Sequence, residues 1–299
     1  MNQLDIVIVN YNSTNTLLKC LGSIFNTMGG VPLKVFVHDN NSHDNVDKIL
    51  LKYPQVDLAK SKHNNGFAKG VNSLLEKGDA PYVMLLNPDT IVFKGLFEKS
   101  TNYMDGNPDV GIMGPRIVNG DGSTQGSARS FPALHTAFFG RASFLTKFFP
   151  NNRFSRANIL TIESDGKTLI EPDWVSGACM VVRRKAIKDI GSMDERFFMY
   201  WEDADWCKRM WQAGWKVVYN PCLSVKHFVG GSSSNSIVRS VFLFHISTYK
   251  FFRKYNQKPF FLLNIFILCI LSLRFCIVLL MHSVNFFIHS TKKVYGCFH

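Results

Sequence analysis

Four short runs of polar residues are the part of the sequence best suited to bind a polar ligand. They cover residues 10–13 (NYNS), 39–42 (DNNS), 63–66 (HNNG) and 87–89 (NPD). Carboxylate and amide oxygens bind polar ligands and divalent cations. The same residue types also cap helices and form turns, which is the simpler interpretation of any single run.

Each of these runs follows a short apolar segment with the composition of a β-strand. We predict strands at residues 4–9, 33–38, 56–60, 82–86 and 110–114, and helices at 16–25, 44–52, 67–77 and 96–104. This alternation predicts an α/β fold, with a mostly parallel sheet and helices on both faces. Ligands bind such sheets at the carboxyl ends of the strands, so four polar strand ends favour a ligand site. The glycine motifs of dinucleotide folds and P-loops are absent from the sequence.

The formal net charge of +12 on this chain of 299 residues is concentrated in one region. All 12 excess positive charges follow Asp205, in 94 residues that contain no Asp or Glu. Such asymmetry predicts an anionic partner, either a membrane or a nucleic acid. Residues 259–288 are rich in Phe, Leu and Ile and are flanked by Lys and Arg. This pattern favours membrane lipids as the partner of the tail and argues against nucleic acid.

The apolar segment is interrupted by Asn264, Ser272 and Arg274, which leaves two modes of membrane association open. A central Arg costs about 3 kcal/mol in a spanning helix, which favours an interfacial or re-entrant hairpin over a single span. The N-terminus lacks the features of a secretory signal, and the seven cysteines form no C-x-x-C pair. Both observations predict reduced thiols and a catalytic part on the cytoplasmic side.

Seven motifs occur in an order that resembles one enzyme family. They are VIVNYNS (7–13), VHDNNSHD (37–44), NNGFAKGVN (64–72), LLNPDT (85–90), WVSGACMVVRR (174–184), FFMYWEDADWCKR (197–209) and KHFVGGS (226–232). Together they resemble the family 2 glycosyltransferases, and among them the bacterial rhamnosyltransferases that build cell-surface polysaccharide. The resemblance covers residues 4–232 and implies a GT-A fold, which is Rossmann-like.

The resemblance also implies a nucleotide site at the first strand ends. Asp39 would accept hydrogen bonds from the base or the ribose, and Asn10 and Tyr11 would line the base pocket. Asn65 and Gly66 would lie beside them, because glycine lets the backbone approach the nucleotide closely. The helix that follows would present its N–H groups to phosphate.

The family uses Mg²⁺ or Mn²⁺ to stabilise the leaving nucleoside diphosphate. Asp89 matches the last acidic residue of the family's D-x-D motif, and His227 resembles the later His that completes metal binding. The first position of the motif is Asn87, which departs from the family. Asn87 can offer a neutral oxygen or contact the ribose, but it weakens the case for a two-carboxylate site. Taken alone, a His after a strand is more often structural.

The family's general base comes from an acidic pair before a helix, which is matched here by Glu202 and Asp203. Acidic residues in a first helical turn also complement the helix dipole, and this is the simpler interpretation of the pair taken alone. By resemblance Asp203 is the expected base, with a pKa raised by the aromatic residues before it. Glu202 would orient the acceptor or Asp203. Trp174, Ser176 and Gly177 would shape the sugar and acceptor pocket, or would form a tightly packed strand.

The sequence therefore predicts an inverting glycosyltransferase on the cytoplasmic face of the bacterial inner membrane. Its expected donor is a nucleotide sugar, with dTDP-rhamnose first, and its expected acceptor is a lipid-linked glycan for O-antigen or capsule. The expected organisation is a GT-A domain at 1–232, a basic linker at 233–258 and a membrane-associating segment at 259–299. Two alternatives stay open: a transferase that charges polyprenyl phosphate, and a catalytically silent nucleotide- or glycan-binding scaffold. Nothing in the sequence favours one oligomeric state.

Overall fold

The computed structural model describes residues 3–131, 158–162, 164–228 and 237–255, together with 265, 267–269, 271–278 and 280. The chain divides into two compact units. One comprises Met1–Glu195 and Glu202–Ser232, and the other comprises Arg196–Trp201 and Ser233–His299.

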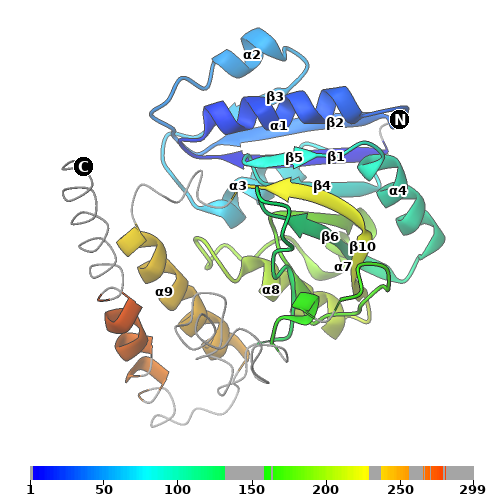
Figure 1. Ribbon diagram of the computed structural model, residues 1–299. Coiled ribbons are helices and arrows are strands. Elements are labelled where there is room, and N and C mark those ends of the chain that lie inside the picture. The colour runs from blue at the N-terminus through cyan, green and yellow to red at the C-terminus, as the bar shows by residue number, and fades with distance from the viewer. Residues whose placement is uncertain are drawn as a thin grey trace, which may run out of the picture. The chain divides into compact units, whose positions relative to one another are not determined.

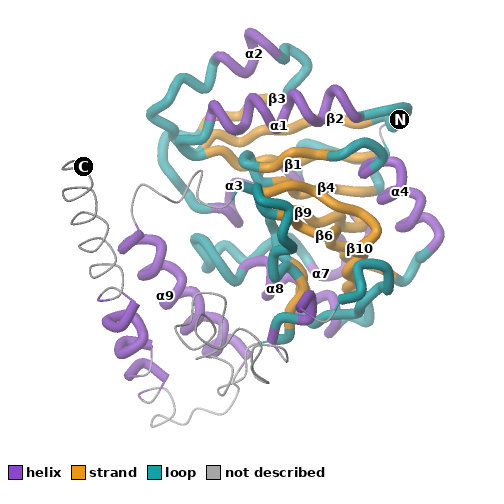
Figure 2. The backbone as a smooth tube through the Cα atoms, in the orientation of Figure 1, coloured by secondary structure: helices purple, strands orange, loops and turns teal. Residues whose placement is uncertain are grey.

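An eight-stranded mixed sheet forms the centre of the first unit (Figures 1 and 2), with the strand order β3-β2-β1-β4-β9-β6-β10-β5. Four parallel strands make one half, namely β1 (Leu4–Asn10), β2 (Leu33–Asp39), β3 (Asp57–Lys60) and β4 (Tyr82–Leu86). The other half is made by β9 (Cys179–Arg183), β6 (Val110–Val118), β10 (Lys216–His227) and β5 (Thr90–Val92). β9 runs antiparallel to both β4 and β6, and β5 runs antiparallel to β10.

Helices cover both faces of the sheet because successive side chains of a strand point to opposite sides. Every residue of β1 is buried, and Ile6 and Ile8 belong to one core cluster whereas Val7 and Val9 belong to the other. The first cluster includes residues of α1 (Thr14–Thr27), α2 (Lys48–Lys52) and α4 (Leu96–Gly106). The second includes residues of α3 (Phe67–Leu75), α7 (Arg184–Ile190) and α8 (Glu202–Gln212). The nearly continuous apolar character of β1 therefore reflects burial on two faces.

The predicted α/β alternation over residues 4–114 is found, and the clearest difference concerns the helix predicted at 44–52. The helix α2 begins only at Lys48. Asp44 is held outside it, because its Oδ2 accepts the backbone N–H of Thr14 over 2.8 Å. Asn45 accepts the N–H of Asp47 through its side chain over 3.1 Å, which also competes with helical hydrogen bonds.

A small two-stranded sheet lies against the main sheet and carries the start of the motif WVSGACMVVRR (174–184). It pairs β7 (Ala128–Arg129) with β8 (Trp174–Val175). Gly114 of β6 permits this approach, since a Cβ at that position would lie 2.7 Å from the Cβ of Val175. A side chain at residue 114 would therefore push β8 away from the sheet.

The second unit is built around α9 (Ile237–Tyr255), which packs on the segment Arg196–Trp201. Ser247 donates a hydrogen bond to the carbonyl oxygen of Met199 over 2.8 Å, and the rings of Trp201 and Phe251 lie 5.2 Å apart. In the part of the chain that the structure describes, no helix is both long enough and apolar enough to cross a bilayer. Most of the predicted membrane-associating segment at 259–299 lies outside the described residues.

Candidate active site

The ends of β1 and β2 bring Asn10 and Asp39 together, because the two residues are direct partners in the parallel register. Both are buried, and Asn10 donates from Nδ2 to Oδ1 of Asp39 over 2.9 Å. The backbone N–H of Ser42 donates to Oδ2 of Asp39 over 3.1 Å, and the Ser42 hydroxyl donates to Oδ1 over 2.5 Å. The carboxylate is thereby fixed in orientation, with a lone pair on Oδ2 left for a further donor. Tyr11 follows directly and is half-buried.

The polar run at residues 63–66 contacts the run at 39–42 through Asn40. Its side chain donates to the carbonyl oxygen of Gly66 over 2.9 Å and accepts the N–H of Asn65 over 3.3 Å. Gly66 has φ +89° and ψ 175° immediately before α3, a conformation that is open almost only to glycine. Asn65 is exposed, while Gly66 is buried. The structure therefore places Asn65 and Gly66 beside the Asp39 run, as a nucleotide site would need.

Asn87, Asp89 and His227 meet at the opposite half of the same sheet edge. His227 at the end of β10 pairs with Thr90 of β5, and Phe228 donates its N–H to the carbonyl oxygen of Asp89 over 3.0 Å. This pairing sets Nε2 of His227 3.1 Å from Oδ1 of Asp89 and 3.4 Å from Nδ2 of Asn87. The two residues that the sequence assigned to a metal are thus neighbours in space.

The donor set around Asp89 fits a divalent cation. Its Oδ1 is buried and makes no hydrogen bond within the described residues, although it faces the imidazole of His227. A carboxylate oxygen and an imidazole nitrogen are both ordinary ligands of such ions. No group of three or more His, Cys, Asp or Glu side chains gathers as a metal site in the described ranges. Few protein side chains are therefore available as ligands, which suits an ion that also binds substrate phosphates.

The acidic pair lies at the start of α8. Asp203 accepts the backbone N–H of Gly177 at Oδ2 over 2.9 Å and that of Ala204 at Oδ1 over 2.8 Å. Burial raises the pKa of Asp203, partly offset by these backbone hydrogen bonds and by the charge of Arg129. Burial and the charge of Asp203 raise the pKa of Glu202 well above its ordinary value. The two backbone N–H donors stabilise the ionised form of Asp203, whereas Oε2 of Glu202 is buried and makes no hydrogen bond within the described residues.

The motif WVSGACMVVRR (174–184) contacts both Asp203 and the segment that carries Asn87. Asn87 donates its backbone N–H to the carbonyl oxygen of Ala178 over 2.9 Å, next to the Gly177 contact with Asp203. Trp174 donates from its indole to the carbonyl oxygen of Ser130 over 3.0 Å, and Ser176 donates its N–H to the carbonyl oxygen of Ser127 over 2.9 Å. The start of the motif, Trp174–Val175, is thus a paired strand, and Gly177 contacts Asp203. The sugar and acceptor pocket stays a prediction.

Three polar residues of the site were given no role by sequence reasoning. Ser42 stands in the polar run after β2, and its position in that run was the only signal. Gln125 accepts from Nδ1 of His227, and the guanidinium carbon of Arg129 lies 5.4 Å from the centre of the Trp174 ring. Gln125 and Arg129 fall in an irregular stretch without periodicity, so no sequence pattern pointed to them. The end of the KHFVGGS motif, from residue 229 on, lies outside the described residues.

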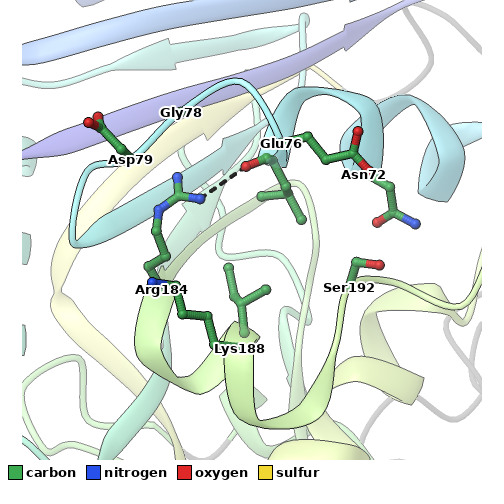
Figure 3. Close-up of a pocket in the computed structure, with 9 residues that line it drawn as sticks. Asn72, Glu76, Gly78, Asp79, Arg184, Lys188 and Ser192 are labelled. Atoms are coloured by element: carbon green, nitrogen blue, oxygen red, sulfur yellow. Dashed lines mark hydrogen bonds between the residues drawn. The ribbon is translucent and has the colours of Figure 1, made fainter.

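A cavity of about 460 Å³ opens elsewhere, beside the amino end of β4 (Figure 3). Its lining includes Glu76, Asp79 and Lys188 together with Arg184. The Arg184 guanidinium donates to Oδ2 of the buried Asp5 over 2.7 Å and to the carbonyl oxygen of Leu75 over 3.0 Å. Because this guanidinium is occupied by structural contacts, the cavity is a weaker candidate than the carboxyl edge.

Comparisons of the sequence place it among enzymes that transfer sugars. The profile of a family described as Glycosyl transferase family 2 matches residues 5–191. A protein of Mycobacterium tuberculosis named N-acetylglucosaminyl-diphospho-decaprenol L-rhamnosyltransferase is 31% identical over 265 residues, or 83% of each chain. Rhamnosyltransferase WbbL of Escherichia coli K12 is 24% identical over 82% of this chain and 91% of its own. The dTDP-rhamnosyl transferase RfbF of Shigella flexneri is 24% identical over 76% and 69%.

Solved structures share the fold. GalNAc-T7, crystallised with UDP, GalNAc and Mn²⁺, superposes with a TM-score of 0.60 at 16% identity over 78% of this chain. The mannosyltransferase PcManGT of Pyrobaculum calidifontis, in complex with GDP-Man and Mn²⁺, superposes with a TM-score of 0.58 at 12% identity over 86%. The superpositions span 45% and 65% of those two chains. The predicted GT-A-like α/β fold is confirmed.

Proposed function

The chain belongs to glycosyl transferase family 2 and is a glycosyltransferase, and from this premise we propose that it moves L-rhamnose from dTDP-rhamnose to a lipid-linked glycan with inversion. The names of relatives from Mycobacterium and Shigella support the sugar, the dTDP donor and a lipid diphosphate acceptor. The proposal rests on two contacts at one edge of the sheet. His227 lies beside Asp89 there, and Gly177 is hydrogen-bonded to Asp203. The product would serve synthesis of cell-surface polysaccharide such as O-antigen or capsule.

The nucleotide would bind over the ends of β1 and β2. Asp39 is buried and oriented by Asn10 and Ser42, so it would accept hydrogen bonds from the base or ribose. Tyr11 is half-buried beside it, as a residue lining the base pocket would be. Gly66 leaves space for the backbone to approach the nucleotide closely, and α3 begins just after it.

Asp89 and His227 would hold a divalent cation, Mg²⁺ or Mn²⁺, with Asn87 beside them. When bound, the ion acts as a Lewis acid that stabilises charge on the leaving diphosphate. Two solved glycosyltransferases of this fold were crystallised with Mn²⁺, which supports the choice of ion. The neutral Asn87 leaves one carboxylate on the protein side, which agrees with a site completed by the donor's phosphates.

Asp203 would act as the general base. It accepts the proton of the acceptor hydroxyl as the hydroxyl oxygen bonds to the anomeric carbon of the sugar. The bond from this carbon to the diphosphate oxygen breaks, and its electron pair leaves with the nucleoside diphosphate. Gly177 holds one carboxylate oxygen through its N–H, which fixes the direction of the other lone pairs. Glu202 would stay protonated and orient Asp203 or the acceptor.

The C-terminal part would keep the enzyme at the cytoplasmic face of the membrane, where a lipid-linked acceptor resides. We assign residues 1–232 to catalysis, 233–258 to a basic linker and 259–299 to membrane association. The second unit contains no acidic residue, and Val238 and Phe242 of α9 are 56% and 51% exposed. Positive charge next to exposed apolar side chains supports attraction to anionic lipid.

The decisive experiment measures binding and slow hydrolysis of dTDP-, UDP- and GDP-sugars by the full chain, with and without Mn²⁺ or Mg²⁺. We expect one donor, dTDP-rhamnose, to be hydrolysed only with metal, and Asp89→Ala to abolish this hydrolysis. Asp109→Ala is the matched control, because Asp109 is exposed and pairs with Lys216 at the start of β10. Absence of nucleotide binding with either metal would refute the site and favour the scaffold alternative. Transfer to polyprenyl phosphate would favour the other alternative.

A further inference from the structure

His227 is held from its far side by Gln125, a buried residue outside the motifs of the sequence. Nδ1 of His227 lies 3.2 Å from Oε1 of Gln125. Nε2 of the same amide donates to the carbonyl oxygen of His227 over 3.0 Å and to Oδ1 of Asn119 over 2.7 Å. One amide side chain therefore contacts both the ring and the backbone of the candidate metal ligand.

The backbone contact decides which amide atom faces the ring. A carbonyl oxygen can only accept hydrogen bonds, so the Gln125 atom next to the His227 carbonyl is the NH₂ group. The atom that faces Nδ1 is then the amide oxygen, which can only accept. Nδ1 of His227 must therefore carry a hydrogen. In the neutral imidazole, Nε2 is then left with a lone pair directed toward Asp89.

A second set of contacts leads independently to the same orientation of the Gln125 amide. Hydrogen bonds from Ser123 lower the pKa of Asp121, so its carboxylate is ionised and only accepts. The Ser123 hydroxyl donates to Asp121 over 2.7 Å, and its oxygen therefore accepts from Nδ2 of Asn119 over 2.8 Å. This leaves Oδ1 of Asn119 as the acceptor for the NH₂ group of Gln125. Each donor and acceptor from Asp121 to His227 is thus determined.

We propose that Gln125 is a positioning residue that holds His227 in the Nδ1–H tautomer, so that the bare Nε2 faces a divalent cation shared with Asp89. The cation rests on the proposed function, whereas the tautomer follows from the protein's own hydrogen bonds. A hydrogen bond from the nitrogen that does not bind the cation fixes the orientation of the imidazole ring. It also raises the basicity of the coordinating nitrogen, here Nε2.

Loss of Gln125 has a specific consequence because of the short distance to Asp89. Without an acceptor at Nδ1, the ring hydrogen moves to Nε2, where Oδ1 of Asp89 at 3.1 Å accepts it. The two ligands would then bind each other, and a cation would have to displace this hydrogen. We therefore expect Gln125→Met to invert the tautomer, since methionine has a similar length but offers no comparable acceptor.

The first test is a two-bond ¹H–¹⁵N spectrum of the full-length, metal-free chain labelled at histidine, with His227→Gln used to assign the signals. We expect Nδ1 of His227 to be protonated and Nε2 bare in the natural chain and in Gln125→Glu, where a carboxylate still accepts. We expect the reverse in Gln125→Met. A neutral ring with its hydrogen on Nε2 in the natural chain would overturn the proposal, whether or not the protein transfers a sugar and even if the Gln125 variants do not fold.

The second test is Mn²⁺ binding measured by electron paramagnetic resonance in the presence of dTDP. We expect Gln125→Met to weaken Mn²⁺ binding by about 10- to 100-fold. Gln125→Glu should recover most of the affinity, and Gln212→Met, a change at an exposed glutamine ending α8, should leave it unaltered. Unchanged affinity in Gln125→Met would contradict the positioning role. Absence of Mn²⁺ binding by the natural chain would instead overturn the proposed metal site, and the spectrum would still decide the tautomer.

Discussion

Gly177 and Asp203 are joined by a hydrogen bond of 2.9 Å from the backbone N–H of the glycine to Oδ2 of the acid. A Cβ at Gly177 would lie 3.4 Å from the Cβ of Asp203, so the chain at this point passes in van der Waals contact with the acid. Because Ala178 in turn accepts the N–H of Asn87, the turn between β8 and β9 contacts both Asp203, the proposed base, and the segment that carries Asp89.

Asp203→Asn should separate catalysis from binding. Asparagine has the shape of aspartate but only one acceptor oxygen, so it can keep the N–H of Gly177 as a partner while the hydrogen bond from Ala204 is lost. We expect the fold to be retained with reduced stability, and the amide cannot take a proton. A general base typically contributes about 100- to 10,000-fold to a rate, and we expect kcat to fall within this range. The Kd for dTDP, measured by calorimetry, should stay unchanged. A variant with natural kcat would remove Asp203 from the mechanism, and Asp109→Asn serves as the control.

The pH dependence of turnover should report the raised pKa of Asp203. The base works only when ionised, so the rate is lost as pH falls through the pKa of the folded enzyme. Burial raises this pKa above the ordinary value of 3.8, and the acid limb of kcat/KM should lie at correspondingly higher pH. The measurement is kcat/KM for donor and acceptor between about pH 4 and 9, around the ordinary carboxyl range. A rate that stays constant down to the ordinary aspartate pKa would contradict the assignment.

Glu202→Gln should make stability less sensitive to pH. Burial, followed by the charge of Asp203, raises the folded-state pKa of Glu202 well above its ordinary 4.5. A raised carboxyl pKa stabilises the fold at low pH, and this contribution is lost as pH rises toward the folded-state pKa. Between the two pKa values the natural chain should lose about 1.4 kcal/mol per pH unit relative to the variant. Urea unfolding at several pH values measures the difference.

The control for this prediction is Glu98→Gln, which changes an exposed glutamate in the first turn of α4. Its stability relative to the natural chain should not increase with pH in this way. If Glu202→Gln were less stable than the natural chain at high pH as well as at low pH, the protonated state of Glu202 would be disproved.

The sequence predicted the elements whose apolar periodicity is unambiguous, and it predicted the polar residues that follow them. The fully apolar β1 and the polar residues Asn10 and Asp39 illustrate this, because burial on two faces and turn chemistry are both local signals. The antiparallel β9 between β4 and β6 was not predictable in the same way. Its position depends on pairing with strands that are distant in the chain.

The contacts that complete the site are also distant in sequence. Gln125 reaches His227 only because β6 and β10 run side by side, and no periodicity marks the stretch that contains it. Tyr200 and Trp201, the two residues before α8, both have φ +71°, which costs non-glycine residues about 1–3 kcal/mol each. Bulky aromatic residues give no local indication of such a backbone, so sequence reasoning treated them only as the aromatic surroundings expected to raise the pKa of Asp203.

Removal of residues 259–299 should release the enzyme from membranes without abolishing donor hydrolysis. The deleted segment supplies apolar residues and three basic residues, Arg274, Lys292 and Lys293, whereas all proposed site residues precede residue 233. Sedimentation with vesicles that contain anionic lipid measures the bound fraction, and neutral vesicles show how much of the binding is electrostatic. An unchanged bound fraction in the shortened chain would refute the anchor and direct attention to α9.

Gly66→Ala should destabilise the fold and weaken nucleotide binding together. Gly66 has φ +89° and ψ 175°, where an alanine Cβ is strained by about 1–3 kcal/mol. Relief of this strain would rotate the peptide whose carbonyl oxygen accepts from Asn40, and would thereby disturb the run that carries Asp39. Gly106→Ala is the control, since this glycine ends α4 without a positive φ and a Cβ there meets no atom within 4 Å. We expect Gly106→Ala to leave urea unfolding and dTDP affinity nearly unchanged. A natural dTDP affinity in Gly66→Ala, despite reduced stability, would show that the start of α3 does not contact the nucleotide.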